Sequence, residues 1–120
     1  MDAAAERRIT VEWDDPFVPL ASARELSGID YLRRMLAGEF SPAPISRLLD
    51  FRLAEVSPGH AVFECTPGEQ HYNPIGVVHG GLAMTLLDSA MGCSIHSLRP
   101  FLPVPQRYST AIFHHPATLK

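Results

Sequence analysis

Two short segments of the chain largely alternate apolar and polar side chains. Residues 51–56 and 61–66 both show this pattern, which is typical of half-buried β-strands. The residues between them include Pro58 and Gly59, which favour a tight turn. The pattern predicts a β-hairpin.

A longer stretch, residues 80–96, is rich in helix formers and too long for a strand. Its apolar residues lie on all sides of the predicted helix, so we expect it to be covered on nearly every side. At 1.5 Å per residue the helix is about 25 Å long, the length of a strand of about seven or eight residues. The simplest cover is a curved antiparallel sheet, which gives an α+β fold.

A second, shorter helix is predicted before the hairpin. Ser27 and Asp30 have the spacing of a capping box, and apolar residues recur at 29, 32, 35 and 36 until Gly38. Beyond the prolines at 42 and 44, residues 45–49 allow one more helical turn.

The remaining segments are predicted to be less regular. Residues 67–78 have the composition of a loop, and residues 1–21 mix acidic residues with prolines and show no sustained periodicity. We therefore expect a loose leader over 1–21 and one domain over 22–120. Near the end of the chain, a strand is predicted over 108–113, followed by a tail without clear structure.

Composition narrows the class of protein. With 120 residues, 46% of them hydrophobic and 19% charged, the chain is expected to form a single globular domain. A net charge of −3 and the absence of a clustered basic stretch argue against nucleic acid as a partner. No segment has the pattern of a signal peptide or a membrane span, so we expect a cytoplasmic protein. Cys65 and Cys93 lack metal-binding spacing and are expected to be buried thiols.

Asp88 is the strongest candidate for chemistry, because it is the one charged residue between positions 80 and 98. A carboxylate in an apolar helix is costly to bury unless it is hydrogen-bonded or functional. A structural carboxylate held by Thr85 or by a neighbouring backbone group is the alternative. A functional Asp88 would lie on the same face as several small residues, where a ligand can approach closely.

The start of the same helix provides a second candidate. The N–H groups of Gly80 and Gly81 belong to its first turn, at the positive end of the helix dipole, where an oxyanion is stabilised. Eight residues separate Gly80 from Asp88, about 12 Å along a helix axis, whereas one reacting carbonyl needs both groups within about 3.5 Å. If both act in one reaction, a second copy of the chain has to supply one of them.

The stretch from Asn73 through Pro74, Gly76 and His79-Gly80-Gly81 to Asp88 resembles the PaaI-like hotdog-fold acyl-CoA thioesterases. Their signature is N-P-x-G-x-x-H-G-G followed by a helical Asp. The resemblance covers about residues 28–97. It implies a hotdog fold, an antiparallel sheet wrapped around a long central helix, and active sites shared between subunits of a homodimer or a dimer of dimers.

The same resemblance implies a role for each matching residue. Asp88 matches the catalytic carboxylate, acting as general base or nucleophile, and Gly80 matches the residue whose N–H polarises the thioester carbonyl. Asn73 and His79 match polar residues that orient water or the thioester. Gly81 and Thr110 are further candidates for substrate binding, Thr110 as a water-positioning hydroxyl. The substrate would be an acyl-CoA, and no metal or cofactor is required.

After residue 98 the sequence departs from the family pattern, because the connection is proline-rich and two further strands are not recognisable. We therefore expect a C-terminally incomplete hotdog domain, weakly stable and prone to aggregation. Two other functions remain open at this point. One is a hotdog hydratase or dehydratase that uses Asp88 and His79, and the other is a remnant that dimerises or binds acyl-CoA without turnover.

Overall fold

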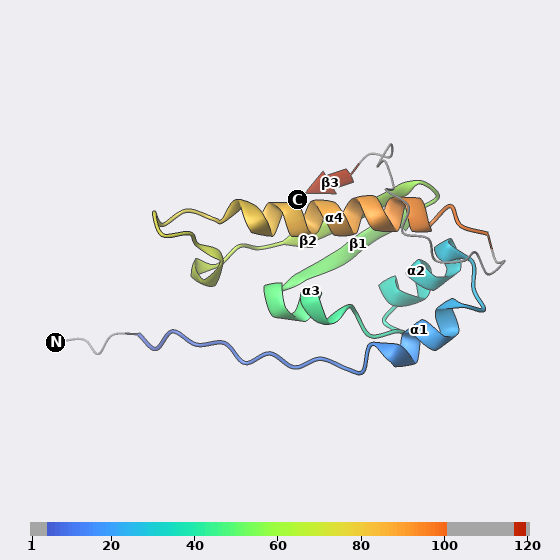
Figure 1. Cartoon of the computed structure of the whole chain (residues 1–120), viewed down its shortest axis with the longest axis horizontal. Coiled ribbons are helices and arrows are strands. Elements are labelled where there is room, and N and C mark those ends of the chain that lie inside the picture. Colours follow the sequence, from blue (N-terminus) through green and yellow to red (C-terminus); the bar gives the residue numbers. More distant parts are fainter. Residues whose placement is uncertain (1–4, 101–116, 120) are drawn as a thin grey trace.

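The computed structural model describes residues 5–100 and 117–119 of the chain. It is a mixed α+β fold in which a long helix lies across a β-hairpin (Figure 1). In chain order the elements are α1 (Phe17–Ala23), α2 (Gly28–Leu36), α3 (Pro44–Leu49), β1 (Phe51–Ser57), β2 (His60–Cys65), the 3₁₀ helix η1 (Glu69–His71), α4 (Gly80–His96) and β3 (Ala117–Leu119).

The predicted hairpin is confirmed. Strands β1 and β2 are antiparallel, with Phe51 opposite Cys65 and Leu53 opposite Phe63, and the register shifts between Leu53 and Glu55. Gly59 adopts a φ of 75°, which an L side chain disfavours, so this glycine permits the tight turn.

The third strand differs from the prediction. Strand β3 lies in the segment expected to have no clear structure, and it runs parallel to β2, with Ala61 opposite Ala117. The expectation of a wholly antiparallel sheet is therefore wrong for this strand. A connection that includes a helix, here α4, is the usual way to join two parallel strands. The strand predicted over 108–113 lies outside the described residues.

Helix α4 has the predicted bounds, but only one face of it packs against the hairpin. Leu82, Leu86 and Ala90 recur every four residues and form the core together with Phe51, Ala61 and Phe63 of the hairpin. The rings of Phe51 and Phe63 meet edge to face, with centroids 5.9 Å apart. Met84 on the opposite face is 66% exposed, so among the described residues α4 is not covered on every side as expected.

The shorter helices are set by local signals. The Ser27 hydroxyl accepts a hydrogen bond from the Asp30 N–H at 3.2 Å and begins α2, as the capping pattern predicts. Helix α1 lies in a region for which no helix is predicted from the sequence. It begins where the Asp15 carboxylate accepts a hydrogen bond from the Phe17 N–H at 2.9 Å. Residues 6–15 before α1, here called the N-terminal arm, have neither helix nor strand structure. No helix in the described ranges has the length and apolar character needed to cross a membrane.

Candidate functional site

The loop that precedes α4 is held in place by a buried histidine. His71 Nδ1 accepts a hydrogen bond from the Gly68 N–H at 2.9 Å, so Nε2 carries the proton and donates to the Leu49 carbonyl, also at 2.9 Å. The His71 carbonyl in turn accepts from the His79 N–H at 2.8 Å. His71 therefore connects the end of α3, the loop and the start of α4. The role of His71 is not predictable from the sequence, because no local pattern shows that a distant carbonyl will face its ring.

Asn73 shapes the tip of the loop. Its side-chain Oδ1 accepts from the N–H groups of Ile75 and Val77, at 3.1 and 3.2 Å, and its own N–H donates to the Val77 carbonyl at 2.8 Å. Gly76 adopts a φ of 79° within this turn. Since the oxygen of the carboxamide is occupied, the group that Asn73 can offer a ligand is its NH₂ donor.

His79 caps α4 with its own side chain. Its Nδ1 accepts from the Gly81 N–H at 2.7 Å, which satisfies one of the free donors of the first helical turn. The ring therefore presents an Nε2–H donor outward. The Gly81 N–H is therefore not available to a ligand, because the His79 ring occupies this donor.

The Gly80 N–H has no acceptor within the part of the chain that the structure describes. It lies at the N-terminus of a 17-residue helix, where the dipole provides roughly half a positive charge. Among the described residues, apart from its two chain neighbours and the nearby backbone of α4, no atom lies within 4 Å of the place that a Cβ would take at this position. An incoming carbonyl oxygen could therefore reach this donor.

Asp88 lies two turns further along α4 and is exposed. Its carboxylate makes neither a hydrogen bond nor an ion pair with any described residue. The Thr85 hydroxyl, the predicted structural partner, donates instead to the Gly81 carbonyl at 2.8 Å. Within the described part of the chain, Asp88 is thus a free carboxylate on the exposed face of α4.

The neighbouring titratable groups have shifted pKa values. Burial, together with the Asp88 carboxylate, raises the pKa of the Cys93 thiol to about 11, so this thiol is protonated and is a poor nucleophile at neutral pH. Burial, followed by the Arg99 charge, lowers the pKa of His96. Burial and the proximity of Cys93 raise the pKa of Tyr31.

The structure thus brings four of the six predicted site residues to one end of α4: Asn73, His79, Gly80 and Gly81. A cavity of about 350 Å³ opens there, lined by Tyr72, His79, Gly81 and Thr85 among others. Asp88 is in the same helix but about 12 Å along its axis, at 1.5 Å per residue. Thr110 lies outside the described residues.

The described residues contain no group of three or more metal-ligating side chains. A search for similar proteins finds no matching family model, curated protein or solved structure.

Proposed function

We propose that two copies of this chain form a hotdog-type acyl-CoA thioesterase, which hydrolyses a thioester to a carboxylic acid and free CoA. The observation that carries the proposal is a pair of groups on α4 that have no partner among the described residues: the Gly80 N–H at its N-terminus and the Asp88 carboxylate on its exposed face. Their complementary chemistry is that of an oxyanion donor and a base.

The spacing along α4 supports a shared site. A single helix holds the two groups about 12 Å apart, too far to act on one carbonyl. In a pair of chains, the Asp88 of one copy could lie beside the Gly80 of the other. The exposed loop before α4 carries apolar side chains that suit such an interface, with Ile75 82% and Val77 52% exposed.

In this scheme the thioester carbonyl oxygen accepts a hydrogen bond from the Gly80 N–H, and the Asn73 NH₂ and the His79 Nε2–H orient the water or the thioester. Asp88 takes a proton from water as the oxygen attacks the carbonyl carbon. The C–S bond then breaks, the thiolate of CoA takes up a proton, and the carboxylic acid is released. Alternatively, Asp88 attacks directly and water hydrolyses the resulting anhydride. A thioester is already activated, so one base and one oxyanion donor suffice.

The test is release of free thiol from a panel of aroyl-CoA, straight-chain acyl-CoA and enoyl-CoA thioesters. We expect Asp88→Asn, a nearly isosteric change on an exposed position, to leave the fold intact and to lower turnover by about 10² or more. The control is Asp30→Asn, another exposed carboxylate, in the first turn of α2, which should retain turnover. Unchanged turnover in Asp88→Asn would remove this residue from the mechanism.

The same panel separates the competing functions. A hydratase would consume an enoyl-CoA double bond without releasing thiol. The hydratase function is less favourable here, because His79 Nδ1 already accepts a hydrogen bond from the Gly81 N–H. This hydrogen bond limits the ability of the ring to act as both acid and base. A non-catalytic remnant would bind acyl-CoA, but neither the unmodified chain nor any variant would show turnover.

A further inference from the structure

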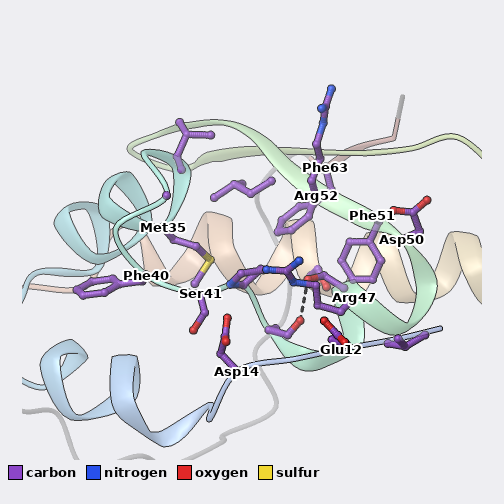
Figure 2. A pocket seen from close by; sticks show the side chains of 18 of the residues that line it. Glu12, Asp14, Met35, Phe40, Ser41, Arg47, Asp50, Phe51, Arg52 and Phe63 are labelled. Atoms are coloured by element: carbon purple, nitrogen blue, oxygen red, sulfur yellow. Dashed lines mark hydrogen bonds between the residues drawn. The ribbon is translucent and has the colours of Figure 1, made fainter.

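A second, larger cavity lies beneath the N-terminal arm. It has a volume of about 1020 Å³, at the upper end of the range for small-molecule sites. Its walls come from the N-terminal arm, the end of α2 with the segment that follows, α3, and strand β1 (Figure 2).

One wall of this cavity is apolar. Phe51 and Phe63 line it from the hairpin, and Met35 and Phe40 line it from α2 and the segment after it, as Figure 2 shows. Phe51 and Phe63 are buried core residues, so this wall is rigid, whereas Met35 and Phe40 are half-buried at its rim. Aromatic rings and a thioether favour an apolar ligand group.

The charged lining argues against an anionic ligand group. On the side of the arm, Glu12 and Asp14 line the cavity together with Arg47 of α3. Arg52 also lines it, but its side chain points away in Figure 2 and its guanidinium pairs with Glu64 at 2.7 Å. Asp50 adds a further carboxylate to the lining. The lining therefore holds three carboxylates and two guanidiniums, one of which is already paired. A ligand carboxylate would meet a net negative potential there.

The cavity reaches α4 at Ser89, which is part of its lining. Ser89 follows Asp88 in the chain, but successive side chains leave an α-helix about 100° apart, so Asp88 itself faces away from the wall formed by Phe51 and Phe63. A thioester whose carbonyl lies near Asp88 reaches this cavity only if its acyl group passes around α4 beside Ser89. No other described cavity combines this volume with an apolar wall next to α4.

We propose that the cavity beneath the N-terminal arm is the acyl subsite, and that it accepts uncharged apolar acyl groups and rejects those that end in a carboxylate. The assignment of the ligand as an acyl group rests on the proposed function. The arm is then a wall of the subsite, because the half-buried Val11 lines the cavity. The N-terminal end of the arm is attached by an ion pair of 2.9 Å between Arg7 and Glu69. Glu12 and Asp14 are the selectivity residues.

The arm also provides a direct signal of binding. Trp13 is the one tryptophan of the chain, and it lines an adjoining cavity of about 510 Å³ together with Val11, Glu12, Asp14 and Arg47. Its fluorescence should therefore change when the acyl subsite is filled, whether or not hydrolysis occurs.

The experiment titrates the Asp88→Asn variant of the full chain with S-hexanoyl-pantetheine and S-adipoyl-pantetheine. These probes have acyl chains of equal carbon number, and one of them ends in a carboxylate. We expect saturable binding of the hexanoyl probe, seen by Trp13 fluorescence and by calorimetry, and at least tenfold weaker binding of the adipoyl probe. Combining Glu12→Gln with Asp14→Asn should strengthen adipoyl binding several-fold and change hexanoyl binding by a much smaller factor.

A second variant tests the place of binding. Val11→Phe fills the cavity from the arm, outside the hydrophobic core, and should weaken hexanoyl binding at least tenfold. Ile9→Phe is the matched control: Ile9 is 58% exposed, lies two residues earlier in the arm and does not line the cavity, so its substitution should leave binding unchanged. Circular dichroism checks that both variants remain folded.

Equal binding of the two probes, no saturable binding, or no effect of Val11→Phe would each overturn the subsite. These results are separate from the proposed function. If the probes bind saturably and selectively but the unmodified chain releases no thiol, the cavity remains a ligand-binding subsite and the thioesterase function is rejected. If the Val11→Phe variant releases thiol with the same KM as the unmodified chain, the proposed thioesterase function stands and this subsite is rejected.

Discussion

The backbone of Gly28, the first residue of α2, lies directly against the backbone of His96, the last residue of α4. A methyl group at position 28 would overlap the His96 carbonyl oxygen, and the Gly28 N–H donates to the Arg99 carbonyl at 3.1 Å. This contact fixes the start of the shorter helix against the end of the longer one, so glycine is required there for space rather than for its φ.

The first prediction follows from this contact. Gly28→Ala should destabilise the chain by about 1–3 kcal/mol, the usual cost of overpacking, because both colliding atoms belong to backbone that cannot rotate away. Urea unfolding followed by circular dichroism measures the change. The control is Gly92→Ala in α4, where the space beside the glycine is open; it should stabilise the chain by about 0.5–1 kcal/mol. Equal stability of Gly28→Ala and the unmodified chain would mean that the two helices do not meet this closely.

The second prediction concerns the shared site. Asn73→Asp keeps the side-chain oxygen that holds the loop and removes the NH₂ donor, so it should lower turnover without unfolding the loop. Mixing it with Asp88→Asn should restore about a quarter of the unmodified turnover, because about half of the dimers then hold one copy of each and one of their two sites is intact. Thiol release after subunit exchange measures the recovery. If verified mixed dimers stay inactive, each site lies within one chain.

The third prediction concerns Cys93. Its folded-state pKa of about 11 lies above the ordinary value of 9.0, so the folded chain holds this proton more tightly than the unfolded chain. The stability it contributes is complete below about pH 9 and is lost as the pH rises from there to about 11. With Cys65→Ser as the background, iodoacetamide should modify Cys93 at pH 8 at least tenfold more slowly than in urea. Asp88→Asn should speed this modification, since the Asp88 charge contributes to the raised pKa.

The fourth prediction concerns acid. The pKa of His96 is lowered below its ordinary 6.5, first by burial and then by Arg99, so the unfolded chain binds this proton more readily than the folded chain. The contribution of His96 to stability is therefore complete above about pH 6.5 and is lost as the pH falls below it. Urea midpoints at pH 7.5 and pH 5.0 should differ in that direction. His96→Phe keeps the edge-to-face contact with Tyr31 and should reduce the difference; an equal difference would assign the acid sensitivity to other groups.

The sequence by itself determined the elements whose signals are local. The hairpin follows from period-two alternation with Pro58 and Gly59 at the turn, α4 from a long run of helix formers, and the start of α2 from the capping hydroxyl of Ser27. It also singled out Asp88 and Gly80, because a lone carboxylate and a pair of glycines stand out in an apolar helix. Their spacing along that helix is a property of the backbone, so it was already contained in the sequence.

Only the tertiary structure decided which of those groups are free. Gly81 proved to be occupied because the His79 ring folds back on it, and Thr85 proved to bond the backbone rather than Asp88. The parallel pairing of β3, the buried His71 and the cavity beneath the N-terminal arm likewise depend on segments far apart in the chain. Such contacts form between partners that no local pattern specifies, because side-chain rotamers and the approach of distant backbone are fixed by packing.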